Sequence, residues 1–472
     1  MTLAHPRFMT RSLISVLVAS AVAGCTMIPK QPAADAGLAQ AFPQAVSGPA
    51  DSKPAQEIAW SEYFADAQLR EVISLALANN RDLRVAALTI EKTRAQYQIE
   101  GAALFPSITA DVGQTGQRTP GEFTSSGNSE VSRKYSGTVG FASYELDVFG
   151  RIRSLKESAL ETFLATQEAR LSVQISLIAE VASAWLRVAA DRERLTLAEK
   201  TYEARQKTYA LTQRSFEMAI VSELELRQAE SLMESARAEA SRLTSSVAQS
   251  ENALAALVGA PLAPDLLPKT LSDRVSAIAE LPVGLPSELL TLRPDIRQAE
   301  RNLRAANANI GAARAAFFPT ISLTASAGSA SSSLDNLFES GTRTWSFIPK
   351  VSLPIFTGGR LRASLNVAEI QRDINVSLYE KAIQQAFREV SDALSVRANV
   401  MQELSARRQL VTANSRTAEL TRARYAAGID SSFQVLDAER TLFASELELI
   451  NTRLTDATNR VTLYKALGGG VQ

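Results

Sequence analysis

Two very long stretches without a helix-breaking residue constrain the fold of this 472-residue chain. Neither proline nor glycine occurs in residues 154–214 or 361–425. Sixty helical residues with a rise of 1.5 Å each extend over roughly 90 Å, which is far longer than the helices of an ordinary globular domain. We therefore expect coiled-coil-like packing. Alanines beside the apolar stripe favour a closed ring of helices over a two-stranded coiled coil.

The chain also contains an internal repeat. Residues 80–108 align with residues 293–321 at an offset of 213, and residues 216–222 align with residues 425–431 at an offset of 209. A short insertion or deletion between the two blocks accounts for the change of offset. So many matching positions indicate a tandem duplication. Matching pairs include Asp82 with Asp295, Arg84 with Arg297, and Phe105-Pro106 with Phe318-Pro319.

Each copy is predicted to contain one helix, two strands and a long helical hairpin. The first helix of each copy should end at Phe105-Pro106 or Phe318-Pro319, because the residue before proline is disfavoured in a helix. After the second of these corners, Ile321, Leu323 and two alanines alternate with small polar residues, as in a strand with one apolar face. In the first copy the apolar phase changes near Ala142-Ser143, which predicts a β-bulge or the end of the membrane-facing band there.

The predicted strands indicate a membrane barrel. Four strands per chain, alternating apolar and polar over about ten residues, match a transmembrane β-barrel better than a soluble sandwich. Four strands cannot close a barrel, and open strand edges are not tolerated in lipid. We therefore expect a mixed α/β membrane protein in which three chains form a twelve-stranded barrel, continued by a long α-helical barrel. Aromatic residues fit the interface girdles of such a barrel: Tyr135, Phe141, Tyr144, Trp345, Phe347 and Phe356.

The N-terminus has the pattern of an export signal. Arg7 and Arg11 precede a short apolar run that ends at Val22-Ala23-Gly24-Cys25. The run is too short to span a membrane and ends in small residues, as at a signal-peptide cleavage site. The last four residues resemble the bacterial lipobox, which predicts that Cys25 is lipidated and becomes the first residue of the mature chain. An ordinary secretory signal with an incidental cysteine is the alternative.

These patterns divide the chain into six segments. They are a lipoprotein signal peptide at 1–24, a lipidated N-terminal tether at 25–60, a first repeat at 61–258, a linker at 259–286, a second repeat at 287–467 and a tail at 468–472. The barrel strands are expected at about 105–119 and 135–149 in the first repeat, and at about 318–331 and 345–356 in the second.

Composition removes several classes of function. His5 and two of the 50 basic residues lie in the signal peptide, so the mature chain keeps 48 basic and 50 acidic side chains and no histidine. This near-neutral balance disfavours a nucleic-acid partner. Without histidine or a free thiol, histidine relays, cysteine nucleophiles and nitrogen- or sulfur-ligated metal sites are excluded. We therefore expect neither an enzyme, nor a cofactor, nor a metal site.

Six motifs carry a resemblance to a known family. They are residues 284–290, 293–296, 312–319, 353–356, 436–440 and 463–470. Through them the chain resembles the trimeric outer-membrane efflux channels typified by TolC and OprM, and the OprM-type lipoproteins most closely, over essentially the whole mature chain. The resemblance implies a homotrimer with a barrel in outer-membrane lipid and a periplasmic helical barrel. It also implies a periplasmic adaptor and an inner-membrane pump of the proton-driven type, with drugs or other small toxic molecules as cargo.

The turns of the two helical hairpins carry matching caps. Ser222 and Glu225 form an S-x-x-E capping box, and Ser431 and Gln434 form its S-x-x-Q counterpart. Gly428 suits the left-handed position that ends a helix, whereas the first copy has Ala219 there. The resemblance places adaptor contact at these tips, on Ala219, Ile220, Ser222, Gly428, Ile429 and Ser431. A purely structural capping role is the alternative for both serines.

A candidate aperture lies just inside the second tip. Phe433, Asp437 and Arg440 have the spacing of residues on one helix face. They match the OprM-type aperture motif, with a bulky phenylalanine at the apolar constriction. In a threefold ring they would repeat around the axis, and Arg440 is expected to pair with Glu225 or Glu230. The alternative is an ordinary surface charge pair.

Two other functions are compatible with this sequence. The same scaffold serves as the outer-membrane component of a protein secretion system. A structural lipoprotein could instead cross the periplasm as a coiled coil without a pore, and its alternating segments would then be soluble strands. The need for closure by several chains counts against this second alternative.

Overall fold

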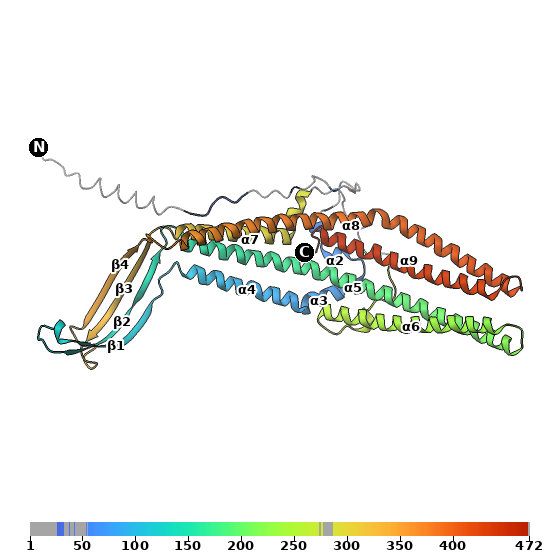
Figure 1. Cartoon of the computed structure of the whole chain (residues 1–472), viewed down its shortest axis with the longest axis horizontal. Coiled ribbons are helices and arrows are strands. Elements are labelled where there is room, and N and C mark those ends of the chain that lie inside the picture. The colour runs from blue at the N-terminus through green and yellow to red at the C-terminus, as the bar shows by residue number, and fades with distance from the viewer. Residues whose placement is uncertain are drawn as a thin grey trace. The chain divides into compact units, whose positions relative to one another are not determined.

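The computed structural model describes residues 26–32, 37, 42, 53, 55–272, 275, 276 and 287–470. The predicted signal peptide and Cys25 lie outside the described residues. The helices and strands are α2 (Trp60–Tyr63), α3 (Ala67–Asn79), α4 (Arg81–Ala102), β1 (Thr109–Thr119), β2 (Glu130–Leu146), α5 (Arg151–Glu217), α6 (Glu223–Val258), α7 (Pro294–Ala315), β3 (Thr320–Ser331), β4 (Arg343–Ser352), α8 (Arg360–Ala426) and α9 (Ser432–Ala466), as Figure 1 shows.

The described residues form two compact units. The sheet unit contains residues 26–32 with Ile90–Thr166 and Ala299–Tyr379, and therefore holds all four strands. The hairpin unit contains the described residues of Asp35–Thr89, Gln167–Gln298 and Glu380–Gln472, and therefore holds the α5–α6 and α8–α9 turns. Helices α5 and α8, which correspond to each other in the repeat, are both 67 residues long. This length agrees with the absence of proline and glycine from both segments.

The sheet is antiparallel throughout, in the order β1-β2-β3-β4. Strands β2 and β3 join the two copies, and their register shifts between Phe141 and Tyr144. Ser143 takes a positive φ of 52° there, and its N–H donates to Thr324 Oγ1 at 3.0 Å. The predicted bulge at Ala142-Ser143 is thus confirmed.

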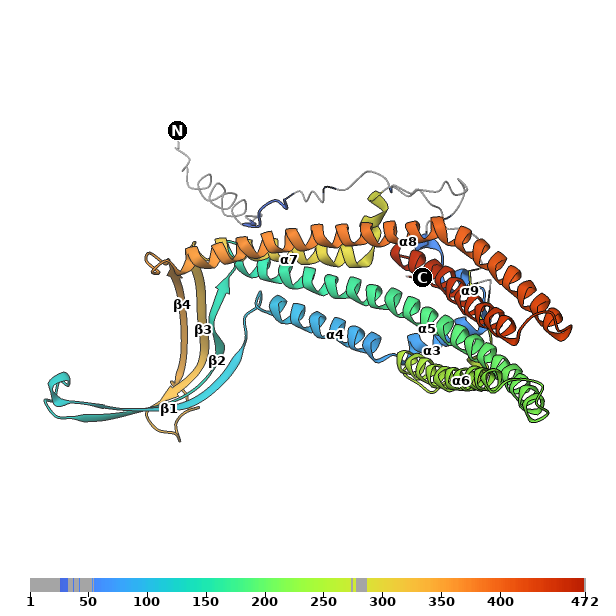
Figure 2. The same cartoon turned by 45° about the vertical axis from the view of Figure 1, so that its right-hand side comes forward.

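The strand limits differ from the expected ones in part. Strand β2 begins at Glu130, five residues before the expected start, because its polar first residues pair with the end of β1 in a hairpin that extends beyond β3 (Figure 2). Helices α4 and α7 end at Ala102 and Ala315, three residues before the Phe-Pro corners. At both ends the N–H of the corner phenylalanine bonds the carbonyl three residues back.

The two faces of the sheet differ in polarity. Val139, Ala327 and Trp345 lie opposite one another across β2, β3 and β4, as do Phe141, Ala325 and Phe347. The other face carries small polar residues, and the hydroxyls of Ser326 and Ser346 lie 2.8 Å apart. Side chains alternate between the faces of a strand, so the apolar side chains gather on one of them. Trp345 is 79% exposed in the single chain, and this apolar face is therefore open to an external partner.

Stacked tyrosines form the centre of the hairpin unit. The rings of Tyr63 and Tyr464 lie 3.9 Å apart and nearly parallel, and both side chains are buried. Their hydroxyls donate to the carbonyls of Arg460 and Ile58. Burial raises the pKa of Tyr63 to about 12, because the charged form would lose its hydration. The tyrosines therefore act as neutral packing groups that hold the N-terminal residues of this unit against α9.

In both copies a side chain at the start of the first helix hydrogen-bonds a carbonyl at the end of the last helix, although the side chains differ. Asn80, just before α4, donates from Nδ2 to the carbonyl of Leu257 at 2.8 Å. Arg293, just before α7, donates from Nη1 to the carbonyl of Ala466 at 2.7 Å. Positions 80 and 293 are equivalent at the offset of 213, and positions 257 and 466 are equivalent at the offset of 209. Each copy thus ties the start of its first helix to the end of its last.

Candidate functional site

The tips of the two hairpins share one backbone geometry. At the first tip the N–H of Ile220 donates to the carbonyl of Ser215 at 2.8 Å, and at the second the N–H of Ile429 donates to the carbonyl of Arg424 at 2.9 Å. The residue before each isoleucine is left-handed, with φ of 51° at Ala219 and 74° at Gly428. Both tips are therefore Schellman motifs, and the alanine in the first copy does not change the turn.

We expect substitutions at these two positions to change the stability of the two tips in opposite directions. Ala219→Gly should stabilise the α5–α6 tip, and Gly428→Ala should destabilise the α8–α9 tip, each by about 1 kcal/mol, because a Cβ is strained in the left-handed region. Hydrogen exchange at the two tips is the appropriate measurement. If the amide hydrogen-exchange rates at the tips were the same in both variants and in the parent chain, Ala219 would not be strained.

Only one of the two predicted capping boxes is present. Ser222 accepts from the N–H of Glu225, whose carboxylate accepts from the N–H of Ser222, so the first box is confirmed. The second prediction is wrong. Ser431 holds the cap position of α9, but within the described residues its side chain makes no capping hydrogen bond. The N–H of Gln434 instead bonds the main-chain carbonyl of Ser431, at 3.2 Å, and this tight first turn satisfies the donor that the hydroxyl would have bound.

The candidate aperture residues lie together at the second tip. Phe433, Asp437 and Arg440, the aperture cluster, line a cavity of about 340 Å³ with Leu436 and residues of α6. Phe433 is 62% exposed, and Arg440 Nη2 lies 2.7 Å from Asp437 Oδ1. The cluster therefore presents an apolar ring and a charge pair on one face, as the helical spacing predicted.

Within a single chain, the two glutamates expected to pair with Arg440 bind other residues. Glu230 pairs with Arg227 at 2.8 Å, one turn away on its own helix. Glu225 completes the Ser222 capping box and also accepts from the hydroxyl of Ser432 at 3.2 Å, which links the tips of the two hairpins. Within one chain Arg440 therefore pairs with Asp437, because local partners on α6 and α9 lie closer. Its pairing with Glu225 or Glu230 in a threefold ring of chains stays a prediction.

Two ion pairs at the second tip were not foreseen. Arg424 donates from Nε and Nη2 to the carboxylate of Asp430 at 2.7 and 2.8 Å, across the turn, and Arg422 binds Glu439 at 2.8 Å between α8 and α9. The Arg424 hydrogen bonds hold the pKa of Asp430 below its usual range. The Arg424–Asp430 interaction is therefore complete at neutral pH and is lost only as the pH falls through that lowered pKa. The first copy has Ser215 and Val221 at the equivalent positions, so a comparison of the copies would have marked this pair.

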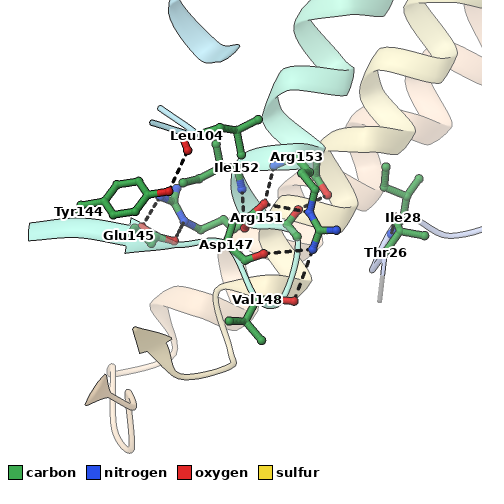
Figure 3. Close-up of polar contacts among 12 residues, drawn as sticks. Thr26, Ile28, Leu104, Tyr144, Glu145, Asp147, Val148, Arg151, Ile152 and Arg153 are labelled. Atoms are coloured by element: carbon green, nitrogen blue, oxygen red, sulfur yellow. Dashed lines mark hydrogen bonds and ion pairs between the residues drawn. The ribbon is translucent and has the colours of Figure 1, made fainter. Parts of the chain in front are cut away.

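A polar network fixes the step from strand β2 to helix α5, in the sheet unit (Figure 3). Asp147 accepts from the N–H groups of Ile152 and Arg153 at 3.0 and 2.8 Å, and so caps α5. Arg151 binds the carboxylate of Glu145 through two nitrogens at 2.8 and 2.6 Å, while the Tyr144 hydroxyl donates to the carbonyl of Leu104. Charge-assisted bidentate pairs of this kind give fixed geometry, which suits a rigid junction.

Two features of the described residues concern metal binding and the crossing of a membrane by a helix. Among them, no group of three or more histidine, cysteine, aspartate or glutamate side chains is placed to hold a metal ion. The 18-residue apolar window in α5 is long enough to cross a membrane, but 61% of it is buried inside the protein, as in a core helix. The sheet unit thus has a sheet with one apolar face, and the hairpin unit has two long helical hairpins with matching tips.

Known proteins with this arrangement are outer-membrane channels. The family model described as outer membrane efflux protein matches residues 72–260 and 285–469. The chain is 47% identical over 469 residues to the antibiotic efflux pump outer membrane protein ArpC of Pseudomonas putida, covering 98% of this chain and 96% of ArpC. It has the same identity and coverage to the toluene efflux pump outer membrane protein TtgC of the same species.

A solved structure supports the same assignment. The open state of the Neisseria gonorrhoeae MtrE outer membrane channel matches with a TM-score of 0.85 and 39% identity, over 95% of this chain and 99% of that one. The chain therefore belongs to the outer membrane efflux protein family. Its mixed α/β fold, a four-stranded antiparallel sheet with long helices, is that of the TolC-type outer-membrane channels.

Proposed function

We propose that this protein is the outer-membrane exit channel of a tripartite efflux system. Drugs or other small toxic molecules pass through it from an inner-membrane pump and a periplasmic adaptor to the outside. The observation that carries the proposal is the sheet with one apolar and one polar face, because a barrel built from it presents its apolar side to lipid and its polar side to a lumen. The names of ArpC and TtgC, both components of efflux pumps, favour efflux over protein secretion.

The channel acts as a homotrimer. Strands β1 and β4 form the two edges of the described sheet, and open edges are not stable in hydrocarbon. Three chains bring together twelve strands, which close the barrel, and the long helices then enclose a lumen that continues into the periplasm. The exposed apolar side chains of β4, Trp345 and Phe347, face the membrane in this arrangement. The pump is of the proton-driven type.

The hairpin tips bind the adaptor, and the aperture cluster controls the pore. Ala219, Ile220, Ser222, Gly428, Ile429 and Ser431 form the adaptor contact. Three copies of Phe433 narrow the bore in the resting state, beside a ring of Asp437 and Arg440 pairs. Adaptor binding at the tips separates the helices and so opens the ring. The Arg424–Asp430 pair across the turn and the Arg422–Glu439 pair between α8 and α9 make the α8–α9 hairpin move as one body.

A lipid on Cys25 anchors the N-terminus in the inner leaflet of the outer membrane. The support is the lipobox pattern in the sequence, together with the absence of any other cysteine from the chain. Stable anchoring takes more than one acyl chain, and a triacylated cysteine meets that need.

Planar-bilayer recording tests the channel function. The purified lipoprotein should produce discrete single-channel currents of small amplitude, because the aperture cluster keeps the resting pore narrow. Insertion should be verified independently, by recovery of the protein in bilayer fractions after a carbonate wash. Inserted protein that carries no current in any state, including the aperture variants considered below, would exclude the channel and favour the structural lipoprotein.

A further inference from the structure

The described N-terminal residues are held in a fitted seat on α7. Asn307 Nδ2 donates to the carbonyl of Pro29 at 2.7 Å. Gly311 leaves room for Ile28, since a Cβ there would lie 2.6 Å from Ile28 Cγ1 and 2.7 Å from Ser154 Oγ. Glycine inside a helix costs about 1 kcal/mol relative to alanine, so its presence needs a local reason. The close approach of Ile28 on one side and of Ser154 on the other supplies that reason.

The internal repeat shows that this seat is specific to the second copy. Positions 307 and 311 correspond to Arg94 and Gln98 at the offset of 213. A long side chain at either place would occupy the space that Ile28 and Pro29 take on α7. The duplicated helix α4 therefore has no equivalent seat, and residues 26–32 have a single defined position in the sheet unit.

This seat directs the chain into a groove between α7 and α8. The groove has a volume of about 940 Å³, at the upper end of the roughly 300–1,000 Å³ usual for ligand pockets. Its lining includes Met27, Phe317, Phe318, Ala363 and Leu365, with Arg314 and Arg362 also among the lining residues. Phe317 and Phe318 are 40% and 38% exposed, so they offer apolar surface to an occupant.

We propose that this groove, here called the acyl groove, binds one fatty-acyl chain of the lipid that Cys25 carries. Cys25 lies two residues before Met27, and two residues of chain reach at most about 7 Å, so the lipid starts beside the groove. The inference rests on the lipidation of Cys25 under the proposed function. The phenylalanines bind the methylene chain, while Arg362 and Arg314, which also pairs with the lining residue Glu369 at 3.6 Å, suit the ester oxygens of the lipid.

An acyl chain bound in this groove would fix the lipid anchor to the protein surface. An acyl chain lying on Phe317 and Phe318 rests at the corner where α7 ends and β3 begins, which the proposed barrel places at the inner edge of the membrane. The lipid then packs against the protein as well as entering the bilayer. The N-terminal segment thereby acts as a strap across α7, held by Asn307 at one end and by the lipid at the other.

Photocrosslinking with a diazirine-bearing palmitate tests the acyl groove. Cells that express the full chain take up the probe, and the purified lipoprotein is irradiated, digested and mapped by mass spectrometry. The expected crosslinks fall on peptides that contain Phe317, Phe318 or Ala363. The equivalent corner of the first copy, at Leu104 and Phe105, serves as an internal control and should gain none.

Two variants separate the possible outcomes. Cys25→Ser should abolish the groove crosslinks, whereas crosslinks that persist would show that bilayer phospholipid fills the groove and would overturn the proposal. Ala363→Trp should reduce them at least fivefold by filling the groove, with the N-terminal peptide still acylated. An unchanged yield in Ala363→Trp, or crosslinks spread over the strands, would also overturn it. An unacylated N-terminal peptide would refute the lipidation itself, while the bilayer currents would still report on the channel.

Discussion

Phe433→Ala is expected to raise the single-channel conductance several-fold, and Asp437→Ala with Arg440→Ala is expected to raise it by a smaller factor. Phe433 is an exposed aromatic side chain beside the charge pair, so in the proposed trimer its removal deletes three rings from the proposed constriction. The double variant removes three Asp437–Arg440 pairs from the same part of the bore. Recording in planar bilayers at fixed salt measures both changes.

A change in conductance distinguishes a gate from an ordinary surface ion pair. An exposed salt bridge contributes about 0–1 kcal/mol, so loss of the Asp437–Arg440 pair changes folding stability little. A change in conductance therefore reports on the pore and not on unfolding. The ion selectivity should also change in the double variant, because a ring of carboxylates favours cations.

The chain offers a matched control for this experiment. Arg416 and Glu419 form a pair of the same type on α8, with 2.7 Å between the charged atoms and both side chains more than half exposed. Arg416→Ala with Glu419→Ala should leave the conductance unchanged. If this control raised the current as much as the aperture variants do, or if the aperture variants left it unaltered, Phe433, Asp437 and Arg440 would lose their assigned role.

Arg293→Ala is expected to destabilise the hairpin unit by about 3–5 kcal/mol. The side chain is only 8% exposed and binds Asp295 through two nitrogens, Glu389 at 2.9 Å and the carbonyl of Ala466 at 2.7 Å. Removing the buried guanidinium breaks its hydrogen bonds to three groups at once and leaves two partly exposed carboxylates without their partner. Arg293→Lys should restore little, because one ammonium cannot make the planar bidentate contact.

Urea unfolding followed by tryptophan fluorescence measures this loss. Trp185 is buried in the same unit and donates to the carbonyl of Leu266, so its emission reports on the packing around it. Asn80→Ala provides the comparison, since Asn80 makes the equivalent bond in the first copy and also caps α4 through the N–H of Leu83. Its loss should cost only about 1–2 kcal/mol. Equal costs for the two variants would contradict the importance of the buried charges.

The duplication made several structural details accessible from the sequence. The two registers, 213 and 209, already relate Asn80 to Arg293 and Leu257 to Ala466, although the bonds that join them become visible only in the folded chain. The same comparison identified Gly428 as a left-handed position, and Ala219 then adopts that geometry despite its Cβ. Local backbone geometry follows the repeat even where the residue differs.

The candidate site was only partly predictable. The aperture cluster was found because Phe433, Asp437 and Arg440 belong to one helix, and helical spacing is a local property. The capping of α9 was predicted wrongly, and within one chain Arg440 has Asp437 as its partner. In each, several donors and acceptors compete over short distances, and the outcome depends on small differences in position that residue spacing does not contain.

The sequence by itself determined the long helices, the existence of four strands, the bulge at Ser143 and the cap at Ser222. All of these follow from neighbouring residues: periodicity, the absence of proline and glycine, and hydrogen bonds over a few positions. Only the tertiary structure decided that Ile28 fits at Gly311, that Arg293 binds Glu389 and Ala466, and that Ser432 reaches Glu225. These contacts join residues between 96 and 283 positions apart, and their energies depend on packing, which brings together side chains that no local pattern relates.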